Sequence, residues 1–145
     1  MRTKEFLNRL EHARIIATIG AAEAKSSGQI RVYIQRGTVT DDALPIAQAK
    51  FEELGMQKTR ERNAVLIFVA PRARKFAIVG DEGVHAKCGT EFWQRLVNGM
   101  QAHFTAEKFT DALVEAIDDS GKLLAQHFPR TSKNANELPD EIIET

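Results

Sequence analysis

The chain has 145 residues, of which 43% are hydrophobic and 28% are charged, and its formal net charge at pH 7 is zero. This length and composition are typical of one soluble globular domain with a core of its own. The balanced charge argues against attraction of the whole molecule to nucleic acid or to a membrane surface. The single cysteine, Cys88, excludes an intramolecular disulfide and a structural zinc site built on several cysteines.

The first twenty residues carry charges throughout and contain no continuous apolar stretch, so we expect no signal peptide. No apolar run approaches the ~20 residues that cross a bilayer. The sequence therefore predicts a cytoplasmic protein with no direct membrane span. A location peripheral to the membrane stays open as an alternative.

The first expected element is a helix that Thr3 caps and that continues to about Lys25, because apolar residues recur along one side of this stretch. Residues 29–36 then alternate between apolar and polar side chains, which indicates a half-exposed strand near an edge of a sheet. A second helix opens at Asp41 and Asp42, whose acidic side chains suit a helix N-terminus, and Gly55 ends it.

Two unbroken apolar runs follow, Ala64–Ala70 and Phe76–Val79, on either side of a short turn with Pro71. Runs of this kind suit strands that are covered on both faces. The second run leads into an expected acidic loop, residues 80–83. Two more helices are expected over about 90–103 and 105–127, each with apolar residues at helical spacing.

Pro129 ends the last helix and closes the expected domain, residues 1–129. The remaining segment, 130–145, is polar and acidic, and we expect it to be disordered. The predicted order of elements contains a strand–helix–strand unit, which implies a parallel pair, followed by an antiparallel strand. The fold class is therefore α/β: an α/β/α sandwich with a small mixed sheet of three to four strands and helices on both faces.

Three segments together carry a family resemblance: EAKSSGQIRV at 23–32, RNAVLIF at 62–68 followed by FAIVG at 76–80, and LLAQHFP at 123–129. Their order and spacing resemble the TPM domain family, which includes a thylakoid-lumen photosystem II repair protein and many bacterial proteins. The sequence departs from the family pattern at residues 81–83, where Gly-Tyr-Gly is common, and at 105–112, where Gly-Asp and Asp-x-Gly are common.

The resemblance implies an α/β/α sandwich and an accessory or interaction domain whose protein partner is membrane-associated. Because the plant member is associated with calcium binding and acid phosphatase activity, the resemblance also implies an alternative, a metal-assisted acid phosphatase of low activity.

The predicted topology brings six candidate ligand-binding residues to one edge of the sheet: Ser26, Ser27, Arg60, Arg62, Asp81 and Glu82. Asp81 and Glu82 are adjacent acids beside glycines, and calcium or another divalent metal prefers such carboxylate and carbonyl oxygens. The two arginines would compete as ion-pair partners, so the alternative is a salt-bridged structural loop.

The opposite edge holds the second choice for a metal, Asp41 and Asp42, beside a basic turn with Arg72, Arg74 and Lys75 that would suit phosphate. Ligands of open α/β sheets favour the carboxyl ends of parallel strands, which lie at this edge. The alternative is a charged turn beside capping acids. The basic residues divide between two edges with no aromatic residues among them, so no nucleic-acid binding is expected.

Overall fold

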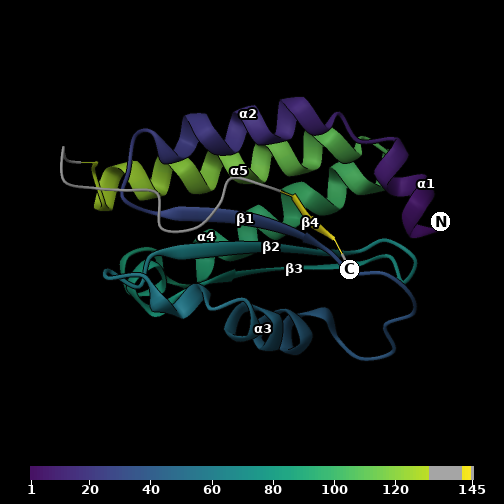
Figure 1. The fold of residues 1–145 in the computed structure, drawn as a ribbon, viewed down its shortest axis with the longest axis horizontal. Helices are drawn as coiled ribbons and strands as arrows, with labels where there is room; N and C mark the ends of the chain where they lie inside the picture. Colours follow the sequence, from purple (N-terminus) through teal and green to yellow (C-terminus); the bar gives the residue numbers. More distant parts are fainter. Residues whose placement is uncertain (131–141, 145) are drawn as a thin grey trace.

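A four-stranded mixed sheet forms the centre of the computed structural model, which describes residues 1–130 and 142–144 (Figure 1). The order of the strands in the sheet is β3-β2-β1-β4. The elements along the chain are α1 (Thr3–Asn8), α2 (His12–Glu23), β1 (Gln29–Ile34), α3 (Ala43–Glu53), the short 3-10 helix η1 (Met56–Lys58), β2 (Ala64–Ala70), β3 (Lys75–Gly80), α4 (Glu82–Thr105), α5 (Phe109–His127) and β4 (Ile142–Glu144). The predicted α/β class is confirmed.

Both strand pairings that the sequence predicted are present. β1 and β2 run parallel with Gln29 opposite Ala64, and β2 and β3 run antiparallel with Val65 opposite Gly80. All seven residues of β2 are buried, as an unbroken apolar run requires.

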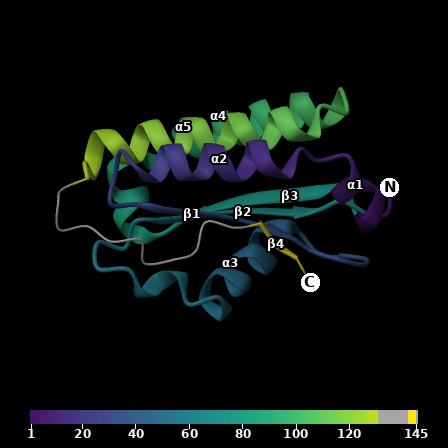
Figure 2. The ribbon, with the colours of Figure 1, turned by 45° about the horizontal axis from the view of Figure 1, so that its top comes forward.

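Helices cover the two faces of the sheet unequally (Figure 2). α2, α4 and α5 lie on one face, where the larger apolar cluster includes Ile19, Ile67 and Ile117. α3 lies on the other face, where a second cluster gathers around Phe51 and Phe68. This arrangement buries all six residues of β1, so the expectation of a half-exposed strand is wrong. Arg31 and Tyr33 alternate with apolar residues, yet they are only 7% and 3% exposed because the α3 layer covers their face.

The expected first helix is two helices. α1 ends at Asn8, α2 begins at His12, and Arg2 caps α1 in place of Thr3, without a side-chain hydrogen bond. Between the two helices, the backbone N–H of Glu11 donates to Thr110 Oγ1 at 3.1 Å. A contact between residues 99 positions apart thus determines where α2 starts.

Residues 80–83 do not form the acidic loop that the sequence predicted. Gly80 ends β3, Asp81 is the N-cap of α4, and Glu82 is the first helical residue. α4 is interrupted at Gly89, whose φ is 71° and ψ is −176°, so the helix expected from about residue 90 is the second part of α4. α5 starts at Phe109, four residues after the start that was expected at about residue 105.

Part of the segment that was expected to be disordered forms a strand. Ile142–Glu144 pairs in parallel with β1, with Val32 opposite Ile142. Ile142 contacts the larger apolar cluster and Ile143 the smaller one, as the alternation of side chains along a strand requires. Residues 131–141 and 145 lie outside the described residues. Within the described part of the chain, no helix is long and apolar enough to cross a membrane.

Candidate functional site

At the edge where β1 and β2 begin, Arg62 binds the two acids of the first predicted site. Its Nε donates to Asp81 Oδ2 at 2.7 Å and its Nη2 donates to Asp81 Oδ1 at 2.8 Å. Its Nη1 reaches Glu82 Oε1 at 3.1 Å. These bonds, chiefly those to Asp81, raise the pKa of the guanidinium. The geometry is that of a bidentate arginine–carboxylate pair.

The helix start fixes this pair in place. Asp81 is only 6% exposed and its Oδ1 also accepts from the backbone N–H of Glu82 at 2.8 Å, as an N-cap residue does. Gly83 N donates to Arg62 O at 2.9 Å, so the first turn of α4 is attached to the backbone of Arg62 itself. Arg62 has a φ of 53°, a left-handed conformation that a non-glycine residue rarely adopts.

The two predicted serines belong to a separate group. Ser27 Oγ donates to Glu61 Oε1 and accepts from Asn63 Nδ2, both at 3.0 Å. Ser26 is fully buried and accepts from the backbone N–H of Gly28 at 3.1 Å. Arg60 is exposed. Among the described residues, no hydrogen bond or ion pair joins the serine group to the Arg62–Asp81–Glu82 group.

A calcium ion does not fit the Asp81–Glu82 pair as it is arranged. Both carboxylate oxygens of Asp81 already accept from Arg62, while calcium needs six to eight oxygen ligands. Within residues 1–130 and 142–144, no group of three or more histidine, cysteine, aspartate or glutamate side chains is placed to hold a metal.

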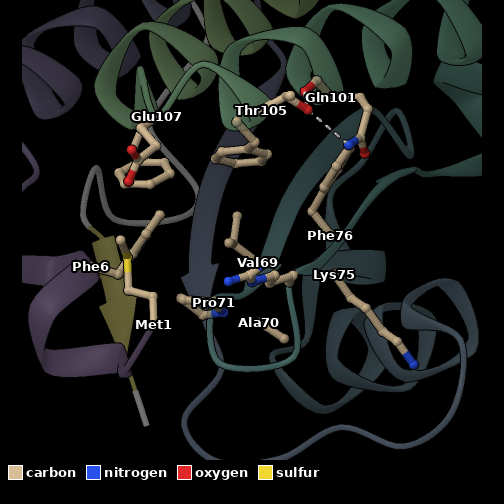
Figure 3. Close-up of a pocket in the computed structure, with 13 residues that line it drawn as sticks. Met1, Phe6, Val69, Ala70, Pro71, Lys75, Phe76, Gln101, Thr105 and Glu107 are labelled. Carbon is tan, nitrogen blue, oxygen red and sulfur yellow. Dashed lines mark hydrogen bonds between the residues drawn. The ribbon is translucent and has the colours of Figure 1, made fainter.

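The opposite edge of the sheet contains a cavity of about 530 Å³ (Figure 3). Val69 and Ala70 at the carboxyl end of β2 line it, together with residues of the β2–β3 turn and the start of β3. The rest of the lining comes from Met1 and α1, the C-terminal end of α4, the α4–α5 turn and the start of α5. The aromatic residues of its lining are Phe6, Phe76, Phe104 and Phe109. Phe6 and Phe109 lie 5.1 Å apart between ring centroids, and so do Phe76 and Phe104. A ligand-sized hollow with aromatic and polar groups in its walls thus lies at the edge where α/β sheets bind ligands.

Three charged residues line this cavity, and two of them are engaged elsewhere. Lys75 Nζ donates to the backbone oxygens of Thr40 at 3.3 Å and Asp41 at 2.9 Å, away from the cavity. Glu107 accepts from Arg9 Nη1 at 3.1 Å. Arg74 is the third, and its guanidinium has no ion-pair partner in the described part of the chain. Among the described residues, Arg74 therefore has the charged side chain of the cavity lining that is available for an anion.

The second choice for a metal, Asp41 and Asp42, lies beside this edge. Both residues are exposed, and the backbone oxygen of Asp41 already accepts from the Lys75 ammonium. A metal ion at Asp41 and Asp42 would lie next to the positively charged Lys75 ammonium. The backbone of this loop at Thr40 and Asp41 is thus attached to Lys75 at the start of β3.

Two residues of the cavity wall have unusual backbone conformations. Arg74 has a φ of 55° and Glu107 a φ of 58°. Left-handed backbone at a non-glycine residue costs about 1 kcal/mol or more, and such positions cluster at binding and catalytic sites. With Arg62 at the opposite edge, these are the three non-glycine residues with positive φ among those described.

A second, smaller hollow adjoins the cavity at the start of α5 and contains three acids, Glu11, Glu107 and Asp111. Each is ion-paired: Glu107 with Arg9, and the other two with Arg14 at 3.3 and 3.0 Å. The hydrogen bond to Asp111 is the main reason why the pKa of Arg14 is raised. The Asp111–Arg14 pair joins α5 to α2, and the Glu107–Arg9 pair joins the α4–α5 turn to the end of α1. None of these three acids is left as an unpaired carboxylate for a metal.

The sequence predicted charged residues at this edge of the sheet and did not predict the phenylalanines that line the cavity. Arg74 and Lys75 were identified at this edge from the carboxyl-end rule, and both line the cavity. Three of the phenylalanines were interpreted as apolar residues of helices and Phe76 as part of a buried strand, because the apolar spacing looks the same whether the face is fully packed or partly open.

Comparisons with known proteins agree with this fold. A family model for the TPM domain matches residues 1–123. The NMR structure of the BA42 protein from the psychrophilic bacterium Bizionia argentinensis superposes with a TM-score of 0.85 at 34% identity, over 93% of this chain and 92% of that one.

The solution structure of the N-terminal domain of the cg2496 protein from Corynebacterium glutamicum superposes with a TM-score of 0.63 at 15% identity, over 88% of this chain and 80% of that one, and shows the likeness of fold alone. No curated protein matches the chain. On the family model and the similarity to BA42, this chain belongs to the TPM domain family.

Proposed function

We propose that this TPM domain is an interaction module that binds a segment of a protein partner in the phenylalanine-lined cavity. The observation that carries the proposal is the cavity itself: about 530 Å³ at the carboxyl end of β2, with four phenylalanines in its lining and one arginine that has no ion-pair partner among the described residues. Binding pockets characteristically combine apolar walls with a few polar groups that fix orientation.

The residues that line the cavity indicate which kind of segment it would bind. Phenylalanine walls favour an aromatic or large aliphatic side chain. Because Lys75 and Glu107 are already engaged, Arg74 would add one ionic contact, with a carboxylate of the same segment. The family resemblance suggests a membrane-associated protein as the partner, which this chain would meet from the cytoplasm.

The test uses N-acetyl-phenylalanine as a probe, because it carries one phenyl ring and one carboxylate. In titrations followed by NMR, we expect shifts confined to the cavity residues, with an affinity of about 1 mM, reasonable for so small a ligand. Arg74→Gln should weaken binding several-fold. Arg72→Gln is the matched control, since Arg72 is an exposed arginine of the same turn that does not line the cavity.

Absence of cavity shifts at tens of millimolar probe, an order of magnitude above that expected affinity, would contradict the proposal. Equal weakening by Arg72→Gln and Arg74→Gln would also contradict it, because general charge would then explain the binding.

A metal-assisted phosphatase of low activity is the second candidate. The observation that favours it is Arg74 in the cavity lining, without an ion-pair partner in the described part of the chain, since a guanidinium binds phosphate bidentately. The nearby acids count against it, because arginines already neutralise them. Hydrolysis of p-nitrophenyl phosphate with and without calcium discriminates the two. Metal-dependent turnover that Arg74→Gln abolishes and Arg72→Gln preserves would favour the phosphatase over the interaction module.

A further inference from the structure

The two edges of the sheet differ in whether their outward backbone groups have partners, and the outward side of β1 is covered. Gln29 N donates to Asn63 O and Gln35 N donates to Val69 O, so the odd-numbered residues of β1 turn their backbone groups toward β2. The even-numbered residues therefore face outward. Glu23 Oε2 accepts from the outward N–H of Ile30 at 2.7 Å, and β4 lies along Val32–Ile34.

The β3 edge is open. Asp81 N donates to Ala64 O at 2.9 Å, and in this antiparallel register residues 75, 77 and 79 also face β2. The backbone groups of Phe76, Ile78 and Gly80 therefore point away from the sheet. Within the described residues, no group is hydrogen-bonded to them. β3 contains no proline, and Lys75 at its start is its one charged residue, so it lacks the usual devices that prevent pairing with another strand.

The residues before β3 are basic and those after it are acidic, so two antiparallel copies of the strand bring opposite charges together. Arg72 and Arg74 precede the strand, and Asp81 and Glu82 follow it. When two copies of β3 run antiparallel with Ile78 opposite Ile78, Arg74 in the turn before the strand of each copy comes near Glu82, the first residue of α4 after the strand, of the other. The same register places Phe76 opposite Gly80, where a side chain is absent and Trp93 fills the space: a Cβ at Gly80 would lie 2.2 Å from its ring. Glu82 is 73% exposed and so remains accessible beside Arg62.

From the open edge and the reversed charge pattern, we infer that a second copy of this chain pairs with β3. The two strands lie antiparallel about a two-fold axis at Ile78 and join the two sheets into one of eight strands. Outward N–H and C=O groups of Phe76, Ile78 and Gly80 bond to their counterparts, as in other cases of strand addition. Two Arg74–Glu82 pairs, equivalent by symmetry, fix the register. This inference shares Arg74 with the cavity, and Glu82→Arg tells the two proposals apart because Glu82 does not line the cavity.

The test measures the mass of the full chain by sedimentation equilibrium over a concentration series. The wild type should pass from monomer to dimer. Arg74→Glu and Glu82→Arg should each weaken the dimer about tenfold or more, because each change turns both attractive pairs into repulsive ones. The double variant, Arg74→Glu with Glu82→Arg, should restore most of the affinity. Glu91→Arg is the matched control, an exposed glutamate of α4 outside the pairing strands, and should leave the dimer unchanged.

Hydrogen exchange on the same samples measures directly which backbone amides are protected. The amides of Phe76, Ile78 and Gly80 should exchange quickly in dilute protein and slow down as concentration rises, while those of Ala77 and Val79 stay protected throughout. A protein that is still monomeric at about 1 mM, which corresponds to only ~4 kcal/mol of association free energy, overturns the inference. A dimer whose outward amides stay unprotected overturns it as well, and so does a double variant that is no better than the single ones.

Discussion

At the scale of single residues, the start of α4 depends on a glycine that the sequence placed in a loop. A Cβ on Gly83 would lie 2.2 Å from Glu61 O and 2.5 Å from Arg62 O. Both neighbours are backbone atoms, so they cannot move aside as a flexible side chain would. The close approach lets Gly83 N bond to Arg62 O, and it positions Arg62 to reach Asp81 and Glu82.

Gly83→Ala should therefore destabilise the fold by about 1–3 kcal/mol, the usual cost of forced overpacking. Urea unfolding measures this. Gly99→Ala is the control, since a Cβ there would meet only Glu115 Oε1 at 3.2 Å and alanine favours a helix. An unchanged stability of the Gly83 variant would mean that the backbone at 61–62 can relax.

The calcium prediction also belongs to single residues. Because Arg62 occupies both oxygens of Asp81, calcium would have to displace an ion pair, and we expect a dissociation constant of ~10⁻⁴–10⁻³ M at best. Calorimetry on the wild type and on Asp81→Asn/Glu82→Gln checks this. Equal binding by both proteins would move the site elsewhere, with Asp41 and Asp42 next to test.

At the scale of elements, α5 carries a carboxylate in an unfavourable environment. Partial burial, and next to it the negative charge of Glu115, raise the pKa of Asp119 above its ordinary value of 3.8. Lys122 opposes this shift and Asp118 adds to it. Between the two pKa values the folded protein keeps a proton that the unfolded chain releases, so stability falls as pH rises through that interval.

Asp119→Asn should therefore raise the melting temperature at pH 7, and the gain should shrink as pH falls toward 3.8. Asp118→Asn, an exposed neighbour one residue away, is the control and should show a smaller effect. A gain for Asp119→Asn that is the same at every pH would point to helix propensity and not to the charge.

At the scale of the whole molecule, β4 attaches residues 142–144 to the sheet beside β1. Ile142 and Ile143 are each partly buried, one on each side of the sheet. The strand also covers the outer edge of β1 from Val32 to Ile34. A segment that was expected to be disordered thereby contributes to both apolar clusters.

Ile142→Asp/Ile143→Asp should cost about 2 kcal/mol, given the partial burial of two isoleucines. For a domain of this size, that lowers the melting temperature by roughly 5–10 °C. Ile16→Asp makes the same chemical change on α2, at an isoleucine that is 40% exposed, and should have little effect. A drop of less than about 2 °C in the double variant would show that β4 adds almost nothing to stability.

Some features of this protein follow from the sequence alone. The unbroken apolar run 64–70 predicted β2, the turn with Pro71 predicted the antiparallel β3, and the helix between β1 and β2 predicted their parallel pairing. Each depends on side-chain periodicity or on connection length, and these are local properties of the chain. The salt-bridged alternative for Arg62, Asp81 and Glu82 also came from local charge and topology.

Other features were decided by contacts between distant segments. Thr110 separates α1 from α2, the α3 layer buries a strand whose alternation indicated exposure, and two isoleucines in an acidic tail add a fourth strand. The cavity exists because four phenylalanines from α1, β3 and the α4–α5 region meet without filling the space between them. Burial and packing are properties of surfaces that meet, and the pattern of one segment does not record which surface it will meet.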